Sequence, residues 1–243
     1  NRDANENVAL FWDGRIEVLD PERLMFRSIM GEKLYSGFTN LLEIQSIFPL
    51  ATEDEMKGKE GNISSNSLPF PHAGKQNEIA KKTGLRSEVA QITYSQKKVV
   101  DRVLGRSKKN PEDWQLQYRE YFFNAFPELT LNDASIMHFG KAIGHFEEFA
   151  FASHDSRWDF YLKGDTSVLS KGEKKGAILF YAKGLCAACH TGRLFSDGQY
   201  HNVGIVSAPI KFEGHYLEDL GRFAVTGQPN DKYKFKTPQL RNV

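Results

Sequence analysis

One motif, GLCAACHTGR from Gly184 to Arg193, constrains this chain more than any other part of its sequence. It holds both cysteines of the protein, Cys186 and Cys189, and His190 follows the second of them directly. A disulfide between positions i and i+3 would close a very small, strained loop and would add little stability. The motif therefore predicts a redox, metal or cofactor site rather than a structural bridge.

Three kinds of site use cysteines at this spacing. A zinc site needs four ligands, and the seven histidines of the chain include no pair at the spacing of a zinc finger. A thioredoxin-type dithiol opens a helix beside a βαβ pattern, which does not precede the motif here. A c-type haem uses all three residues, because Cys186 and Cys189 can form thioethers one turn apart and His190 can ligate the haem iron. The haem interpretation is favoured, and zinc stays an alternative.

Composition narrows the classes of partner. Of the 243 residues, 40% are hydrophobic and 26% are charged, which suffices for one large or two modest cores. The formal charge is only +1, so no global field attracts nucleic acid or an anionic membrane. No stretch reaches the roughly 18 apolar residues that a membrane span needs. Because the N-terminal NRDANENV lacks a secretion signal and the chain stops at Val243, we expect a piece of a longer, processed precursor.

Hydrophobic periodicity predicts a mainly helical chain. Apolar residues recur at three- and four-residue steps across 136–150, which predicts a helix that Asn132 caps. Ser170-Lys-Gly-Glu173 is a capping-box pattern that opens a second helix, and Gly184 is placed to end it. The cysteine motif should therefore follow a helix directly. From Thr191 onward the periodicity is lost, so we expect loops and turns there.

The cysteine motif lies in a long stretch that resembles one protein family. Residues 176–205, GAILFYAKGLCAACHTGRLFSDGQYHNVGI, and 219–243, DLGRFAVTGQPNDKYKFKTPQLRNV, resemble the C-terminal haem domain of bacterial di-haem cytochrome c peroxidases and their MauG-like relatives. Three upstream stretches also resemble that family: FWDGR (11–15), LLEIQSIFPLATEDEM (41–56) and AFASHDSRWDFYLKGD (150–165).

The resemblance implies a mainly α fold with two cytochrome c-like haem domains, whose N-terminal and C-terminal ends are missing from this chain. Residues 1–164 would be the remainder of the N-terminal, peroxidatic domain, and residues 165–243 most of the C-terminal, electron-transfer domain. Family members carry two CxxCH motifs, whereas this chain has one. The first motif would precede residue 1, and the distal ligand of the His190 haem, usually Met or Tyr, would follow Val243. This chain would then carry one haem c, and the complete protein would carry two in all.

Three residues upstream of the motif match catalytic positions of that family. Trp12 matches the tryptophan between the two haems, where an indole divides one long electron transfer into two short steps. Without the resemblance, Trp12 would be predicted to be a core aromatic. Glu55, which a methionine follows, matches the acid beside the peroxide-reacting haem, and Gln45 matches a glutamine that accompanies it. From the residues alone, Glu53, Asp54 and Glu55 are equivalent solvated carboxylates.

Positions near the C-terminus correspond to the family less specifically. Thr237 and Pro238 match the neighbourhood that supplies backbone oxygens to a calcium ion, with a simple turn as the alternative. Arg222 and Arg241 are candidates for charge-assisted hydrogen bonds to haem propionates, or else for surface ion pairs. His201 is best explained as a hydrogen-bonded structural histidine.

The resulting hypothesis is a haem-dependent oxidoreductase of the cytochrome c peroxidase type, which reduces hydrogen peroxide with electrons from a small redox protein. Two alternatives stay open. One is a MauG-like or MbnH-like enzyme that uses peroxide to oxidise tryptophan on a partner protein, which the long polar insert at 57–81 favours slightly. The other is a mono-haem electron carrier. Because haem is attached outside the cytoplasmic membrane in such bacteria, we expect a periplasmic protein, and a homodimer is a candidate assembly.

Overall fold

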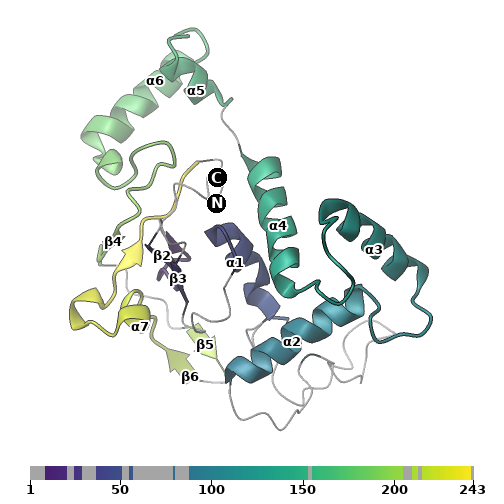
Figure 1. The fold of residues 1–243 in the computed structure, drawn as a ribbon. Coiled ribbons are helices and arrows are strands. Elements are labelled where there is room, and N and C mark those ends of the chain that lie inside the picture. The colour runs from purple at the N-terminus through teal and green to yellow at the C-terminus, as the bar shows by residue number, and fades with distance from the viewer. Residues whose placement is uncertain are drawn as a thin grey trace. The chain divides into compact units, whose positions relative to one another are not determined.

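A computed structural model describes residues 9–20, 25–28, 37–50, 55–56, 79, 88–152, 155–204, 210–212 and 215–241. Its α-helices are α1 (Leu41–Ile47), α2 (Glu88–Val103), α3 (Asp113–Ala125), α4 (Ile136–Phe151), α5 (Arg157–Leu162), α6 (Lys171–Ile178) and α7 (Phe223–Thr226). Its strands are β1 (Ala9–Leu10), β2 (Ile16–Asp20), β3 (Met25–Ser28), β4 (Tyr200–His201), β5 (Ile210–Phe212), β6 (His215–Leu217) and β7 (Phe235–Lys236). The predicted mainly α fold is confirmed (Figure 1). Among the described residues, no helix has both the length and the hydropathy to cross a membrane.

Internal contacts divide the chain into two compact units. One unit combines residues 1–29 with residues 146–243, and the other contains residues 30–145. The predicted domain boundary at residue 164 falls inside the first unit and stays a prediction.

In the unit of residues 30–145, α1 begins where the sequence supplies two polar caps. The Asn40 side chain accepts a hydrogen bond from the Glu43 N–H (3.0 Å), and the Glu43 carboxylate accepts from the N–H and the hydroxyl of Thr39 (2.7 Å each). These bonds satisfy backbone donors that an uncapped helix start leaves without partners. The apolar side chains of α1 are buried, namely Leu41, Leu42, Ile44 and Ile47. Capping and burial together hold the helix that carries Gln45.

Helix α4 approaches α1 through two glycines that share one helix face. A Cβ on Gly140 would lie 2.7 Å from the Glu43 carbonyl oxygen, and a Cβ on Gly144 would lie 2.7 Å from the Glu43 backbone nitrogen. Real Cβ atoms essentially never come so close to other heavy atoms. The contact also places Nε2 of His145 3.6 Å from the buried Glu43 carboxylate. Glycine at both positions is therefore required for this packing.

We expect Gly144→Ala to lower the free energy of unfolding by about 1–3 kcal/mol, because the new methyl group would overlap backbone rather than a flexible side chain. Gly176→Ala is the matched control, since Gly176 also lies within a helix and a Cβ there meets nothing within 4 Å. The control should be neutral or stabilising by about 0.4–1 kcal/mol, because alanine restricts the unfolded chain. Urea unfolding measures both values. Equal stabilities of the two variants would contradict the close α1–α4 contact.

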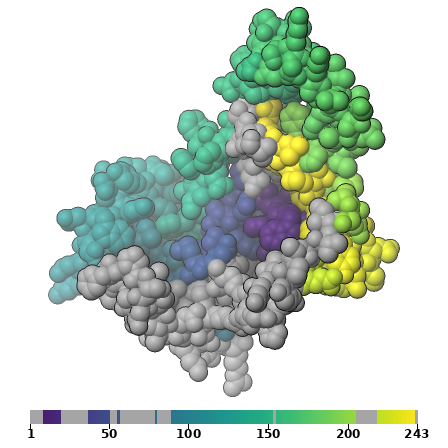
Figure 2. Space-filling view, turned by 180° about the vertical axis from the view of Figure 1, so that it is seen from behind, coloured from purple at the N-terminus to yellow at the C-terminus, as the bar shows by residue number. Residues whose placement is uncertain are grey.

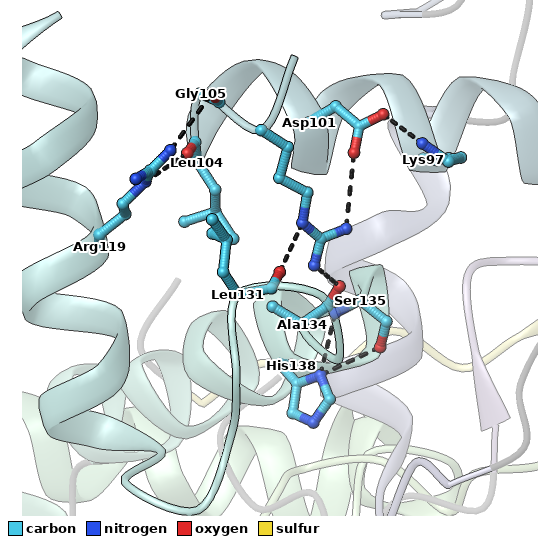
Figure 3. Close-up of polar contacts among 10 residues, drawn as sticks. Lys97, Asp101, Leu104, Gly105, Arg119, Leu131, Ala134, Ser135 and His138 are labelled. Carbon is cyan, nitrogen blue, oxygen red and sulfur yellow. Dashed lines mark hydrogen bonds and ion pairs between the residues drawn. The ribbon is translucent and has the colours of Figure 1, made fainter. Parts of the chain in front are cut away.

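Helices α2, α3 and α4 enclose a small apolar core, whose buried members are Val100, Leu104, Phe122 and Ala134. The Arg106 guanidinium donates to the carbonyl oxygens of Leu131 (2.6 Å) and Ala134 (Figure 3). It also lies 3.5 Å from the carboxylate of Asp101 on α2. Charge-assisted bonds of this kind satisfy loop carbonyls that would otherwise be buried without donors. Arg106 thus ties the end of α2 to the loop that precedes α4.

The start of α4 differs from the sequence prediction. Asn132 lies in a turn before the helix, and α4 begins at Ile136. The neighbouring Asp133 carboxylate instead accepts from Thr130, which closes that turn. At the true helix start, the Ser135 N–H donates to Nδ1 of His138 (3.1 Å), and partial burial lowers the pKa of His138. The imidazole in the first turn of α4 thus accepts from the residue that precedes the helix, and Asn132 is not its cap.

In the unit of residues 1–29 and 146–243, the described strands are short and antiparallel. Strands β1, β2 and β3 form one sheet, β4 pairs with β7, and β5 pairs with β6. Tyr200 lies opposite Lys236 and His201 opposite Phe235. In the described residues after Thr191, helices are limited to α7 and a single 3₁₀ turn. The predicted change from periodic helix to loops and turns is therefore confirmed.

Helix α6 leads directly into the cysteine motif, as predicted. The Ser170 N–H donates to the Glu173 carboxylate (2.7 Å) and the Ser170 hydroxyl accepts from the Glu173 N–H (3.2 Å), which is the predicted capping box. Hydrogen bonds to its carboxylate from the backbone and side chain of Ser170 and from the Arg157 guanidinium lower the pKa of Glu173 to about 2. A π-helical turn at Leu179–Lys183 follows, and Gly184 ends it with a right-handed φ of −79°. Gly184 is needed for close approach instead, because a Cβ there would lie 2.8 Å from the Leu179 carbonyl oxygen.

Candidate functional site

The cysteine motif forms one tight turn. The chain enters it through Leu185, whose φ of 54° is uncommon for a bulky residue. Cys186–Ala188 then form a 3₁₀ turn, and the N–H groups of Cys189 and His190 donate to the Cys186 carbonyl oxygen (3.3 and 2.9 Å). Both thiols are free, with Cys186 exposed and Cys189 partly buried. The turn thus gathers two thiols and an imidazole within a few residues.

A backbone carbonyl orients the ring of His190. Nδ1 lies 2.9 Å from the carbonyl oxygen of Phe195. A carbonyl only accepts, so Nδ1 carries the proton and Nε2 keeps its lone pair for a metal. Phe195 reaches this position with φ of 53°, a strained conformation of the kind found at functional sites. Such a bond to the second ring nitrogen is the usual support of a metal-ligating histidine.

The surroundings of the motif suit a large apolar cofactor. Several apolar side chains just before the first cysteine are about half exposed or more: Ile178 (64%), Leu179 (53%), Tyr181 (48%) and Leu185 (72%). A cavity of about 290 Å³ adjoins this segment and is lined by aromatic rings that include Trp158, Phe180 and Phe195. Exposed apolar surface at this density marks a binding site. Together with two thiols and a free imidazole Nε2, it fits a c-type haem.

Hydrogen bonds from the C-terminal segment 235–241 fix the loop that follows the motif. The Thr237 N–H donates to the Gln199 carbonyl oxygen (2.9 Å), and the Ser196 hydroxyl donates to the Thr237 carbonyl oxygen (2.7 Å). Ser196 is the neighbour of Phe195 in the chain. These bonds therefore fix the carbonyl group that orients the imidazole.

A buried ion pair anchors that C-terminal segment. The Arg241 guanidinium contacts both carboxylate oxygens of Asp159 (2.5 and 3.0 Å), and its Nε donates to the Arg193 carbonyl oxygen (2.8 Å). The Arg241 side chain is only 6% exposed. Burial disfavours the ionised form of Asp159, but hydrogen bonds from Ser156 and the charge of Arg241 outweigh it and lower the pKa of Asp159. Helix α5, the loop after the motif and the C-terminal segment are thereby joined.

Trp12 lies in the turn between β1 and β2, where Phe11 and Gly14 both have positive φ (65° and 69°). Its carbonyl oxygen accepts from the Lys236 N–H (2.7 Å). In Figure 2 the described N-terminal segment, in purple, accordingly lies against the C-terminal segment, in yellow. The Trp12 residue is 47% exposed, and the Arg15 guanidinium lies 4.4 Å from the centroid of its ring. A half-exposed ring does not fit the alternative of a core aromatic.

Arg222 fixes the same turn from the other side. Its guanidinium donates to the carbonyl oxygens of Asp13 (3.2 Å) and Gly14 (3.0 Å) and pairs with the Glu17 carboxylate (2.5 Å). Each arginine thus pairs with a carboxylate of the chain, which agrees with the ion-pair alternative, although both side chains are largely buried rather than on the surface. Contacts of either arginine with haem propionates stay a prediction. Both arginines position the segments around the motif.

The candidates Gln45 and Glu55 belong to the other unit. Gln45 is partly buried on α1, and Glu55 is exposed in a turn that follows this helix. Glu53 and Asp54, the two acids beside Glu55, lie outside the described residues. Residues 57–78, most of the expected polar insert, lie outside them as well. A shared role of Gln45 and Glu55 stays a prediction.

The C-terminal candidates differ in accessibility. Thr237 is 5% exposed and its carbonyl oxygen already accepts from Ser196, whereas Pro238 is exposed. Their calcium role stays a prediction. His201 is hydrogen-bonded through Nε2 to the Asp197 carboxylate (2.7 Å), as predicted for a histidine with a hydrogen-bond partner.

Sequence reasoning missed several residues of this arrangement. Phe195 acts through its backbone carbonyl, which no side-chain pattern indicates. Lys236 is partly buried, and this burial lowers its pKa, although its sequence neighbours give no sign of it. The pattern Ser156-x-x-Asp159 is a capping-box signal that could have indicated α5. The additional pairing of Asp159 with Arg241 depends on tertiary structure alone.

Comparison with known proteins identifies similar chains. The family model described as di-haem cytochrome c peroxidase matches residues 2–167. Cytochrome c551 peroxidase of Pseudomonas aeruginosa is 36% identical over 129 residues, which cover 52% of this chain and 36% of that protein. The methylamine utilization protein MauG of Methylorubrum extorquens is 31% identical over 128 residues, which cover 52% and 33%. The matched region spans about a third of these relatives.

A solved structure supports the fold. The crystal structure of a MauG-like protein associated with microbial copper homeostasis matches 99% of this chain and 53% of that chain, with a TM-score of 0.55. The sequences are 22% identical, so the likeness shows the fold alone.

Proposed function

Because this chain belongs to the di-haem cytochrome c peroxidase family, we propose that it is part of a c-type haem enzyme that reduces hydrogen peroxide to water. One observation carries the proposal: the motif turn presents two free thiols beside a histidine whose Nδ1 is bound to the Phe195 carbonyl. The overall reaction consumes hydrogen peroxide, two electrons and two protons and yields two water molecules. The electrons come from a small redox protein.

When bound, haem c supplies an iron centre that accepts and passes on single electrons. The residues of this chain would hold and tune it. Cys186 and Cys189 would fix its position by thioether bonds, and His190 would ligate the iron through Nε2. The Phe195 carbonyl makes that imidazole more basic by accepting from Nδ1, and the bonds around Ser196 keep the carbonyl in place.

Trp12 is proposed as a relay for electrons between the two haems of the complete protein. Its half-exposed ring and its fixed backbone agree with a redox-active rather than a packing role. Arg222 and Lys236 position the turn that carries it. The role requires an indole at this place and not merely an aromatic ring.

We expect Trp12→Phe to keep the fold and the haem content while slowing electron transfer between the haems, because phenylalanine is much harder to oxidise than tryptophan. Rapid mixing of the complete, half-reduced protein with peroxide measures the transfer. Trp114→Phe is the matched control, since this ring is also partly exposed but lies in the other unit on α3. Unchanged transfer in Trp12→Phe would return this residue to a purely structural role.

Peroxide chemistry is proposed for Glu55 with Gln45. Cleavage of the O–O bond needs a group that takes a proton from one peroxide oxygen and delivers a proton to the departing one, and a carboxylate can do both. Gln45 would hold the peroxide by hydrogen bonds, since its amide both donates and accepts. The fixed start of α1 supports that placement of Gln45.

Oxidation of tryptophan on a partner protein is a second candidate function, favoured by the 31% identity with MauG. Both functions use peroxide, and they differ in the source of the electrons. Turnover with a reduced c-type cytochrome supports the first, and peroxide-dependent oxidation of tryptophan in an added protein supports the second. Absence of both would leave a mono-haem electron carrier. We also propose a periplasmic location, two haems in the complete protein and calcium bound near Thr237 and Pro238.

A further inference from the structure

A second set of ligand atoms lies beside the cysteine motif. Sγ of Cys189, a carboxylate oxygen of Asp197 and a ring nitrogen of His201 all lie within 4.8 Å of one another. The three residues come from the motif turn, the loop after it and β4. All three are partly buried, so the cluster is neither a surface group of acids nor a lone cysteine.

Backbone contacts hold the cluster together. The Asp197 N–H donates to the carbonyl oxygen of Cys189 (2.8 Å), which ties these two residues directly. One Asp197 oxygen accepts from the Gln199 N–H (2.9 Å), and the other lies 2.7 Å from Nε2 of His201. Pairing of β4 with β7 fixes the backbone of His201. The ligands therefore need little ordering before a cation binds, because second contacts already orient the carboxylate.

The donor set has the chemistry of a zinc-type ion. Thiolate, imidazole and carboxylate ligands bind Zn²⁺ at about 2.0–2.3 Å, so tetrahedral ligands lie roughly 3.5 Å apart. Nε2 of His201 and its Asp197 oxygen lie 2.7 Å apart, closer than this, so they must separate by roughly 1 Å for both to bind one ion. All the ligand atoms lie within 4.8 Å of one another. The ammonium group of Lys236 interacts with Asp197 and opposes a cation, while a thiolate and a carboxylate together outweigh this single charge. Three protein ligands leave a fourth position for water.

We propose that Cys189, Asp197 and His201 form a divalent metal site of the Zn²⁺ class in the haem-free chain. Attachment of haem adds the Cys189 S–H across a vinyl C=C bond of the porphyrin, so that an S–C bond forms, the S–H bond breaks and the proton goes to the other vinyl carbon. The resulting thioether is a far weaker ligand for such an ion, so attachment abolishes the site. Metal binding and haem attachment therefore compete for one sulfur atom. This consequence rests on the proposed function, whereas the metal site itself does not.

The test uses the full chain prepared without haem. Titration with Co²⁺ should give one ion per chain and an absorption band from sulfur to cobalt, and Zn²⁺ should displace it. Asp197→Asn and His201→Gln should each weaken binding at least about tenfold, and Cys189→Ser should remove the sulfur band. Cys186→Ser is the matched control, because this exposed thiol belongs to the same motif but lies outside the cluster. It should bind like the unchanged chain.

The outcomes separate this site from the motif itself. Equal loss in Cys186→Ser and Cys189→Ser would show that the ion sits on the CxxCH turn and would overturn the proposal. Unchanged affinity in both Asp197→Asn and His201→Gln would do the same, and circular dichroism identifies any variant that fails to fold. Failure of haem attachment with intact cobalt binding would refute the proposed function only. Loss of the cobalt band after haem attachment would support the competition.

Discussion

Replacing both Cys186 and Cys189 by alanine should abolish all haem that stays bound after denaturation. Each thioether needs a thiol, and these are the only cysteines of the chain, so no other residue can take their place. The turn that holds them is stabilised by backbone hydrogen bonds to the Cys186 carbonyl oxygen, which alanine keeps. The variant should therefore fold. A haem assay on the denatured, solvent-extracted protein, with its intact mass, measures the loss.

Thr191→Ala is a suitable control, because Thr191 follows the motif directly and contributes no ligand. It should retain the haem content of the unchanged protein. Full covalent haem in the double cysteine variant would end the haem interpretation of the motif. The same mass measurement on the complete protein distinguishes one haem from two, and so separates a di-haem enzyme from a mono-haem carrier.

Local signals explain how much of this fold could be predicted. The capping box at Ser170 and the helical periodicity across 136–150 depend on neighbours in the sequence, and both helices form where expected. The caps were less predictable. Asn132 is a good cap residue by type, yet its neighbour Asp133 closes a turn with Thr130 and the helix starts four residues after Asn132.

The candidate site, like the fold, could be predicted only where its contacts are local in the sequence. The CxxCH spacing indicates thiols and imidazole within one turn, and the structure forms that turn. The supports of the turn could not be predicted, because they join distant segments: Arg241 pairs with Asp159, and Arg222 reaches Glu17. Nothing in the composition around either arginine distinguishes a buried partner within the chain from a propionate. For that reason the sequence predicts the motif itself but leaves both alternatives open for the two arginines.

Exchanging Glu55 for glutamine should lower peroxide turnover by about 10²- to 10⁴-fold, the usual loss when an acid–base group is removed. Glutamine has nearly the same shape but cannot take a proton from one peroxide oxygen and return it to the other. Glu55 is exposed in its turn, so the exchange should not disturb the fold. The haem spectrum and the covalent haem content should stay unchanged. Steady-state turnover with a reduced c-type cytochrome as electron donor measures the effect in the complete protein.

Glu53→Gln is the matched control for this experiment, because it makes the same chemical change two residues away in the sequence. Charge alone does not distinguish the two acids, and only the methionine that follows Glu55 selects it. Glu53→Gln should therefore leave turnover near that of the unchanged protein. A pH profile adds a second readout, since loss of the acid–base group should remove one ionisation from the turnover curve of Glu55→Gln. Equal losses at both positions, or full turnover in Glu55→Gln, would show that the proton-transferring group lies elsewhere in the chain.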